Sequence, residues 1–441
     1  MTQVNARLAH LGLGAFHRAH QAWYTHRANL DQSGDPWLIT AFTGRQVELA
    51  RILSDQDGRY TLIERAADGD HATMIETHAA ALPGGDHESW RSVLADDQIS
   101  VLTTTVTEAA YLIDDQDRQR LAAGEAGISV PARIVDGLRG RHRSGGAPIA
   151  VLCCDNLTDN GTMLRGRVLE LAGDLGADFA DWVAGSVTFP SSMVDRITPA
   201  TTADDLVVAK ELSGWDDRAP VITEPFSEWV IAGDFPAGRP AWDVAGVRFV
   251  ADVQPYEQRK LWLLNGAHSL LAYLGLQRGL STIAETMADP VCVAAMEDAW
   301  RDAAAVLPFK QAEIDAATAA LRDRFGNPRI QHRLAQIAAD GSQKFPVRFG
   351  DVYRHRRSAG LDHGAALPLA VAAWICHLQT DLVKDAGAVE LITALAGAAG
   401  DADRVRLALA VLGPEAADDN HLARDTEARL TELHTTGETP S

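Results

Sequence analysis

The sequence predicts two domains: an α/β domain with a doubly wound, mainly parallel sheet, followed by an all-α domain. The chain has 441 residues, which is too long for one core of ordinary size. Continuous apolar runs, typical of a parallel sheet covered on both faces, occur in the first part of the chain. Beyond Pro255, Ala/Leu-rich helical periodicity replaces them. We therefore expect domains at residues 1–250 and 251–412, and a surface helix with a tail at 413–441.

The first elements follow the order of a nucleotide-binding unit. An apolar strand at residues 8–13 runs into a glycine turn at Gly12 and Gly14, then a helix through Tyr24 and a strand at 37–42. Strand, glycine turn, helix and strand in this order begin a Rossmann-type domain. Further strands of the parallel sheet are expected at 60–63, 100–106 and 149–154, with helices at 132–141 and 163–175.

The second domain is expected to consist of helices alone. Its periodic segments contain few β-branched residues, and their apolar positions recur at helical spacing. The predicted helices span residues 260–274, 291–307, 312–325, 367–378, 386–396 and 405–411.

The composition excludes several classes of partner. A formal charge of -20 repels nucleic acid and anionic membranes over most of the surface, and no segment has the length of a membrane span. Four cysteines without a C-x-x-C spacing favour neither a disulfide framework nor structural zinc. No signal peptide is recognisable. We expect a cytoplasmic protein that binds neither nucleic acid nor membrane.

Residues 260–268 combine a lysine, an asparagine and a histidine with an apolar segment. In a regular helix of about 100° per residue, His268 lies about 80° and Asn265 about 140° around the helix axis from Lys260. A lysine among leucines loses hydration, which favours its neutral form. A neutral amine is what a general base requires to deprotonate an alcohol. A buried lysine paired with a carboxylate is the alternative, equally compatible with the spacing.

The glycine turn could let the backbone approach a pyrophosphate at a helix N-terminus. The third glycine of the usual pattern is missing, and Arg18 lies close by instead; a tight turn without a ligand is the alternative. For the cofactor ribose, Arg45 would favour a 2′-phosphate, whereas Glu48 would accept hydrogen bonds from free hydroxyls. Both could equally be ordinary solvated charges.

Other polar residues follow predicted strands, at the edge where α/β sheets place ligands. Glu108 follows the strand at 101–107, and Asn156 follows the strand at 149–154. Helix capping and turn formation are the alternatives for these two residues. Asp195 and Arg196 form either a substrate clamp or a structural ion pair.

Tyr256 and Lys260 match the Tyr-x-x-x-Lys spacing of short-chain dehydrogenases. In that class the pair lies in the cofactor domain, whereas here it begins the helical part. We interpret the match as coincidental.

The chain resembles the long-chain mannitol dehydrogenase family, which includes mannitol 2-dehydrogenases, fructuronate reductases and related polyol dehydrogenases. The resemblance covers residues 8 to at least 346. Its motifs lie at residues 10–21, 105–108, 154–156, 160–161, 189–199, 224–226, 238–240, 260–276 and 340–346.

The resemblance implies a role for each matching residue. Lys260 would be the catalytic acid/base, Asn156 and Asn265 would hold the substrate oxygen, His268 would orient the substrate hydroxyl, and Glu108 would relay the proton to solvent. Asp195 and Lys344 would contact substrate hydroxyls. The dinucleotide turn would comprise Gly12, Gly14, Phe16 and Arg18, with Glu48 selecting NAD over NADP. No metal is implied, and the sequence shows no cluster with ligand spacing.

By this resemblance we expect reversible hydride transfer between NAD and a secondary alcohol of an open-chain polyol. Mannitol and fructose are the first choice, because no paired arginines are present to bind a carboxylate. Fructuronate reduction to mannonate is the second, because Gln336 replaces an arginine of mannitol 2-dehydrogenases. A mannitol-1-phosphate 5-dehydrogenase-like activity and an NAD-binding sensor are further alternatives. The expected partner is a polyol, ketose or ketouronate, and the expected state a monomer.

Overall fold

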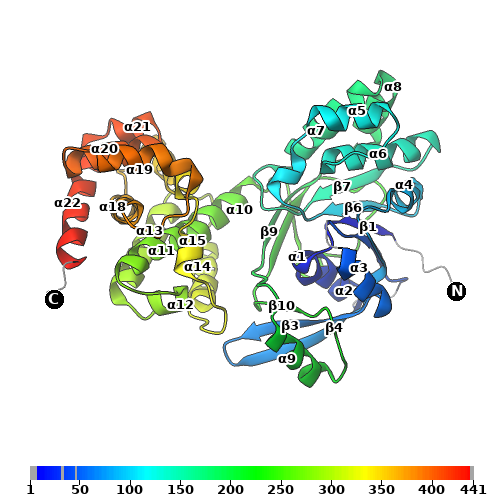
Figure 1. Ribbon diagram of the computed structural model, residues 1–441, viewed down its shortest axis with the longest axis horizontal. Coiled ribbons are helices and arrows are strands. Elements are labelled where there is room, and N and C mark those ends of the chain that lie inside the picture. The colour runs from blue at the N-terminus through cyan, green and yellow to red at the C-terminus, as the bar shows by residue number, and fades with distance from the viewer. Residues whose placement is uncertain (1–6, 31–33, 45–46, 438–441) are drawn as a thin grey trace. The chain divides into compact units, whose positions relative to one another are not determined.

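The computed structural model describes residues 7–30, 34–44 and 47–437. The chain divides into two compact units, Met1–Gln254 and Pro255–Ser441 (Figure 1), close to the predicted division at residue 250. Among the described residues, no helix has both the length and the apolar character needed to cross a membrane.

The N-terminal unit is built on a six-stranded sheet in the order β5-β2-β1-β6-β7-β8. All neighbouring strands are parallel. The strand order reverses between β1 and β6, which is the point where such sheets bind dinucleotides. The predicted Rossmann-type sheet is therefore confirmed. Its strands are β1 (Leu8–Leu11), β2 (Ile39–Phe42), β5 (His78–Leu82), β6 (Val101–Thr104), β7 (Ile149–Cys153) and β8 (Val187–Thr188).

Helices accompany this sheet, and two clusters of buried apolar side chains form the unit's main cores. The helix expected to run unbroken from the glycine turn is interrupted at His20, where the backbone leaves the helical region at φ -122° and ψ -85°. The elements are α1 (Ala15–Ala19), α2 (Gln21–Leu30), α3 (Val47–Asp55), α4 (His87–Ala95), η1 (Glu108–Tyr111), α5 (Asp115–Ala122), α6 (Val130–Arg143), α7 (Asn160–Asp174), α8 (Ala177–Ser186) and α9 (Ala203–Ser213).

Two small sheets complete the unit. One has the order β10-β3-β4 and the other β12-β11-β9. The strand expected at residues 60–63 forms as part of β3, but its assignment to the parallel sheet is wrong, because β3 pairs antiparallel with β4 and parallel with β10. The strands are β3 (Tyr60–Ala66), β4 (Gly69–Ile75), β9 (Ser191–Asp195), β10 (Val221–Thr223), β11 (Glu228–Ala232) and β12 (Arg248–Val250).

The C-terminal unit is helical, with one continuous core around α11 and α18. Two of its segments, η2 and η3, are π-helices. The elements are α10 (Gln254–Arg259), η2 (Lys260–Gly266), α11 (Ala267–Gln277), α12 (Ile283–Thr286), α13 (Pro290–Ala304), α14 (Gln311–Phe325), α15 (Leu334–Ile337), α16 (Gly341–Phe345), η3 (Pro346–Gly350), α17 (Asp351–Ser358), α18 (Ala366–Leu378), η4 (Ala386–Ala388), α19 (Val389–Ala396), α20 (Asp401–Leu412), α21 (Pro414–Ala417) and α22 (Asn420–Gly437).

The last helix, α22, packs against α18 and α20. Leu422, Thr426 and Leu430 are fully buried, and their spacing of four residues places them on one face of the helix. One face of α22 is therefore part of the core of this unit.

Candidate active site

The predicted cofactor turn lies at the switch point of the parallel sheet. Gly12 follows β1 with φ of +105°, and a Cβ built on it would lie 2.0 Å from the carbonyl oxygen of Thr105, at the end of β6. The backbone N–H groups of Gly12 and Leu13 both donate to the carbonyl oxygen of Phe42, at 2.9 Å. Only glycine fits at position 12, for reasons of both conformation and space. Gly14 precedes α1 in an extended conformation.

Arg18 supports this turn from within the protein. Its side chain is only 5% exposed, and its Nε donates to the carbonyl oxygen of Gly14 at 3.2 Å. Its guanidinium also donates to the carbonyl oxygen of Ala219. Burial lowers the pKa of Arg18 from its usual value. Phe16, also predicted at the turn, is half-buried and stacks on His20 with ring centroids 5.1 Å apart.

A buried cluster of histidines, which the sequence analysis did not identify, lies beside the turn. The rings of His10 and His17 stack with centroids 3.4 Å apart, and His17 Nε2 lies 3.0 Å from His78 Nε2. Burial lowers the pKa of His10 and of His78 to about 3, so both rings are neutral. The cluster joins β1, α1 and β5 and thereby holds the start of α1.

Glu48 lies in the first turn of α3 and is exposed. Its carboxylate accepts hydrogen bonds from Arg51 at 2.5 and 3.0 Å. These bonds lower the pKa of Glu48, which keeps the carboxylate charged. Arg45, the alternative contact to the ribose, lies outside the described residues.

The loops after β6 and β7 carry Glu108 and Asn156, both exposed. Asp155, directly before Asn156, is buried and ties the two loops together. Its Oδ1 accepts from the backbone N–H of Val106 at 2.6 Å, and its Oδ2 accepts from the Tyr111 hydroxyl. Burial raises the pKa of Asp155 to about 6, although both hydrogen bonds oppose the rise. Asp155 directly follows the predicted strand at residues 149–154, as Asn156 does one residue later, but its connection of the two loops was not predicted from the sequence.

Asn160 connects the Asn156 loop to β9. Its Nδ2 donates to the carbonyl oxygens of Asp155 at 3.0 Å and Ser192 at 2.8 Å, and its Oδ1 accepts from the backbone N–H of Ser192 at 3.0 Å. Asp195 is the last residue of β9 and is 8% exposed. The N-terminal unit therefore holds the segments that carry Asn156 and Asp195 in a fixed register.

Arg196 forms a structural ion pair, which was one of its two predicted roles, and not a substrate clamp. Its guanidinium forms an ion pair with Glu64 at 2.5 Å and donates to the carbonyl oxygen of Ala19 at 2.7 Å. The guanidinium carbon also lies 4.3 Å from the centroid of the Trp23 ring. These contacts use the side chain of Arg196 inside the protein.

Lys260 and Asn265 lie in the π-helix η2, which corrects the predicted regular α-helix. Hydrogen bonds from residue i to i+5 place these residues one turn apart on one side of the segment, whereas the α-helical estimate put them about 140° apart. Side chains from other elements hold two carbonyl oxygens of η2: Trp300 donates to Leu263 at 2.8 Å, and Arg348 donates to Asn265 at 3.1 Å.

Arg348 was also not predicted from the sequence as part of the site. Besides the carbonyl oxygen of Asn265, its guanidinium donates to the hydroxyl oxygen of Ser269 at 2.7 Å. Burial lowers the pKa of Arg348 to about 10. The side chain thereby links η3 to η2 and α11, and sets the backbone position of Asn265.

His268 follows η2 in the first turn of α11 and is 9% exposed. Its ring stacks on Phe325 with centroids 4.4 Å apart. Burial lowers the pKa of His268 well below its usual value, so the ring is neutral. Within the described part of the chain, His268 Nε2 has no hydrogen-bond partner. A buried nitrogen without a partner is unfavourable by about 1–3 kcal/mol, and a substrate hydroxyl is a group that could satisfy it.

Lys344 in α16 is half-buried. Its ammonium donates to the carbonyl oxygens of Ile337 at 3.3 Å and Ala339 at 2.5 Å, and an ammonium has three donors. Burial, and secondarily the charge of Arg348, lowers the pKa of Lys344. Gln336, from the segment that distinguishes the possible substrates, is exposed.

Tyr256 of α10 is half-buried and packs edge-on against Phe309, with ring centroids 5.2 Å apart. This contact gives Tyr256 a packing role and favours the interpretation of the Tyr-x-x-x-Lys spacing as coincidental.

A Rossmann-type sheet with a glycine turn at its switch point, followed by a helical unit with a lysine and an asparagine on one π-helical turn, defines a two-domain dehydrogenase. Family models match both units: the mannitol dehydrogenase Rossmann domain at residues 6–244 and the mannitol dehydrogenase C-terminal domain at residues 252–399. The chain belongs to the mannitol dehydrogenase family, which confirms the predicted resemblance and the predicted enzyme class.

Relatives with different names are similar to this chain. The D-mannonate oxidoreductase of Escherichia coli is 37% identical over 404 residues, covering 86% of this chain and 81% of the relative. The mannitol 2-dehydrogenase of Cereibacter sphaeroides is 33% identical over 389 residues, covering 85% and 81%. The solved ternary complex of Pseudomonas fluorescens mannitol 2-dehydrogenase with NAD and D-mannitol aligns with a TM-score of 0.79 and 32% identity, covering 99% of this chain and 94% of that chain. These relatives establish the family, and their names differ in the substrate.

Proposed function

We propose that the protein is an NAD-dependent polyol dehydrogenase that interconverts a secondary alcohol of an open-chain sugar alcohol and the corresponding ketose. The observation that carries the proposal is the placement of Lys260 and Asn265 one turn apart on the π-helix η2. A base and an amide donor on one turn can act on the same hydroxyl group. Family membership and the position of Gly12 at the switch point support the same reaction.

NAD supplies the hydride acceptor when it is bound. The residues of the turn fit it, because Gly12 packs directly against the residue that follows β6 and so sets the tight turn at the switch point of the sheet, where such sheets bind a pyrophosphate. Gly14 and Phe16 belong to the same turn, and Arg18 stabilises it by donating to the carbonyl oxygen of Gly14. Glu48 remains charged beside Arg51, and its carboxylate would repel the 2′-phosphate of NADP.

In oxidation, the neutral amine of Lys260 accepts the proton of the substrate hydroxyl. The hydride leaves the carbon atom that carries this hydroxyl. The side-chain amides of Asn156 and Asn265 donate to the substrate oxygen, which gains negative charge in the transition state. His268 is neutral and offers its unsatisfied Nε2 to the substrate hydroxyl. Glu108 is exposed, as required of a group that passes the lysine's proton to solvent.

Asp195 and Lys344 are proposed as contacts to further substrate hydroxyls. The proposed substrate pair is mannitol and fructose, and mannitol is the substrate in the names of the mannitol 2-dehydrogenases that the chain is similar to. The second candidate is fructuronate and mannonate. It is supported by the 37% identity to D-mannonate oxidoreductase and by the ammonium of Lys344, which could pair with a carboxylate.

A side-by-side assay of NADH-dependent reduction decides between these substrates. Fructose, fructuronate and fructose 6-phosphate are compared, and we expect the highest kcat/KM for fructose. Loss of fructuronate reduction in Lys344→Met, with fructose reduction retained, would instead make Lys344 the carboxylate anchor of a uronate reductase. Absence of turnover with a whole polyol panel, together with retained NAD binding, would favour a sensor.

The compartment and the oligomeric state are also proposals. The cysteines are all free thiols, three of them buried, which fits a reducing compartment such as the cytoplasm. We propose a monomer, and light scattering that gives the mass of two or more chains would contradict it.

A further inference from the structure

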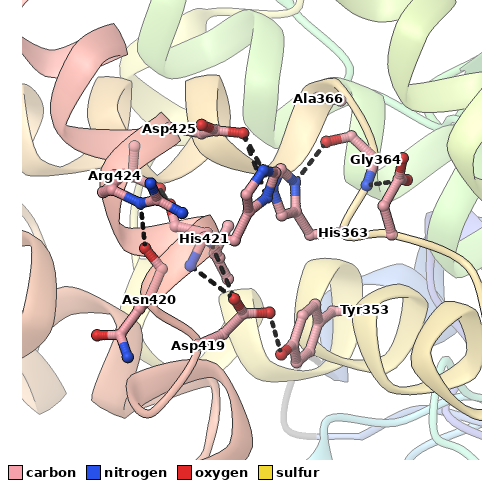
Figure 2. Close-up of polar contacts among 12 residues, drawn as sticks. Tyr353, His363, Gly364, Ala366, Asp419, Asn420, His421, Arg424 and Asp425 are labelled. Atoms are coloured by element: carbon pink, nitrogen blue, oxygen red, sulfur yellow. Dashed lines mark hydrogen bonds and ion pairs between the residues drawn. The ribbon is translucent and has the colours of Figure 1, made fainter.

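Two histidines and an aspartate that no part of the proposed reaction uses come together in the C-terminal unit. His363 lies in the segment between α17 and α18, and is buried. His421 and Asp425 lie four residues apart on α22, on one face of that helix. Figure 2 shows the His363 and His421 rings and the Asp425 carboxylate pointing toward one another. Among the described residues, this is the one group of three or more such side chains with the geometry to hold a metal ion.

The atoms that could bind an ion are close to one another. His363 Nε2 lies 2.9 Å from His421 Nδ1 and 3.1 Å from Asp425 Oδ2. His421 Nδ1 lies 3.7 Å from Asp425 Oδ2. Tetrahedral zinc with bonds of about 2.0–2.1 Å places its ligand atoms about 3.3 Å apart. Two of the three separations are slightly shorter than this value and one is slightly longer, so small side-chain rotations would bring the three atoms to the distances of zinc ligands.

The proton on His363 can be assigned from its other contact. His363 Nδ1 lies 2.7 Å from the carbonyl oxygen of Gly364, which only accepts, so Nδ1 carries a hydrogen. In the neutral ring, Nε2 then presents a lone pair to His421 and Asp425. An ionised carboxylate also only accepts, so His363 Nε2 and Asp425 Oδ2 face each other as two acceptors. A second proton on His363 Nε2 or a bound cation removes this conflict, and a cation bound by all three atoms also uses His421 Nδ1, 2.9 Å from His363 Nε2.

The two segments that carry these residues are held in place by further polar contacts. Asp419 Oδ1 accepts from the backbone N–H groups of His421 and Leu422, both at 3.0 Å, which caps the start of α22. The Tyr353 hydroxyl donates to the other oxygen of Asp419 at 3.0 Å. Figure 2 shows this chain of contacts below His421.

On the other side, the loop of His363 is fixed by Arg356. Its guanidinium donates to the carbonyl oxygen of Asp362 at 3.0 Å and to the carboxylate of Asp362 at 2.8 Å. The same carboxylate accepts from the backbone N–H of Gly364 at 3.0 Å. Supports of this kind orient metal ligands and raise affinity.

We propose that His363, His421 and Asp425 form a zinc site that fastens α22 to the segment preceding α18. Two imidazoles and one carboxylate suit zinc, with water completing a four-coordinate ion. The side chains of His421 and Asp425 are 64% and 46% exposed, which leaves room for water. These two ligands lie beyond residue 399, where the family match ends, and none of the three is a candidate catalytic residue. The ion has a structural role and takes no part in hydride transfer.

The test is zinc titration of the tag-free, chelator-treated full chain by calorimetry, with thermal unfolding as a second measurement. We expect one zinc ion per chain and a higher Tm with zinc, but not with magnesium, which prefers oxygen ligands. Co²⁺ in place of zinc should give the visible absorption of a four-coordinate ion. His421→Gln and Asp425→Asn alter exposed residues, so folding is retained, and each should weaken zinc binding at least about tenfold.

His434→Gln is the matched control. His434 lies on the same helix and also faces a carboxylate, with Nδ1 3.5 Å from Asp401 Oδ2, but no second histidine joins them in the described structure. This variant should bind zinc as the wild type does. The proposal is overturned if the wild type binds no zinc, if His421→Gln and Asp425→Asn bind it with unchanged affinity, or if His434→Gln loses it equally. These measurements do not depend on the proposed dehydrogenase activity.

Discussion

Replacing Asp155 by Asn should change the pH dependence of stability in the N-terminal unit. Asp155 is buried where the loops after β6 and β7 meet, and its carboxylate accepts from the backbone N–H of Val106 and from the Tyr111 hydroxyl. An asparagine has nearly the same shape. Its carbonyl oxygen can accept from Val106, and its amide can donate to the Tyr111 oxygen, so the connection between the loops is preserved while the titrating group is removed.

The magnitude follows from the pKa of Asp155, which burial raises from 3.8 to about 6. A shift of about 2 units corresponds to about 3 kcal/mol. Below pH 3.8 the carboxyl group is protonated in both the folded and the unfolded chain. As pH rises from about 4 to about 6 the unfolded chain ionises first, so the wild type loses stability, and above pH 6 the loss is constant. Relative to Asp155→Asn, the wild type should therefore become less stable by about 3 kcal/mol between pH 4 and pH 7.

The assay must report on the N-terminal unit, because a chain of two units need not unfold in one step. Cys154 is buried directly after β7, so the urea dependence of its labelling by a thiol reagent, located by peptide mapping, follows this unit. Wild type and variant are compared at each pH, which cancels the pH dependence of the labelling chemistry. Tyr111→Phe removes a hydrogen bond that lowers the pKa of Asp155, so it should move the transition to higher pH. A stability difference that is the same at pH 4 and pH 7 would refute the reasoning.

Three further predictions concern catalysis and cofactor binding. Lys260→Ala should lower kcat for alcohol oxidation by about 10²–10⁴ while Tyr256→Phe leaves it unchanged, and the opposite result in steady-state assays would make the tyrosine the acid/base. Gly12→Ala places a Cβ 2.0 Å from a backbone carbonyl oxygen, so the Kd for NAD, measured by fluorescence titration, should rise at least about tenfold; an unchanged Kd would exclude the turn as the cofactor site. Arg348→Met removes the donor to the carbonyl oxygen of Asn265 and should lower kcat about tenfold, as one lost hydrogen bond of about 1.4 kcal/mol implies, without changing the Kd for NAD. A lower Tm with normal kcat would limit Arg348 to a structural role.

The parallel sheet could be predicted where its strands are apolar and β-branched. Residues 149–153 and 101–104 form buried strands at the predicted positions. The edge strand β5 was missed because His78–Leu82 contains three alanines and no β-branched residue, so local preference does not indicate a strand. Its pairing with β2 is a tertiary effect, as is the inclusion of residues 60–63 in a different sheet.

Predictions for the candidate site depended on how far each contact reaches along the chain. Residues next to strand ends, such as Asn156, could be recognised from their position. The π-helical turn of Lys260 could not, because the same residues also fit an α-helical pattern, and the contact that holds Asn265 comes from Arg348, 83 residues away. His421 and Asp425 have the spacing of a metal-binding pair on a helix, but their third member, His363, lies 58 residues before His421.

In both units, buried side chains hold backbone groups of the segments that carry the candidate catalytic residues. Arg348 and Trp300 donate to carbonyl oxygens of η2, and Asn160 and Asp155 bind backbone groups of the loops that carry Asn156 and Glu108. Loops and π-helical turns leave backbone groups without regular partners, and buried side chains satisfy them here. We therefore expect each proposed catalytic side chain to contact substrate while its backbone is fixed. Substitution of a supporting residue should consequently lower kcat while leaving the pH profile in place, whereas substitution of Lys260, the proposed base, should remove that profile.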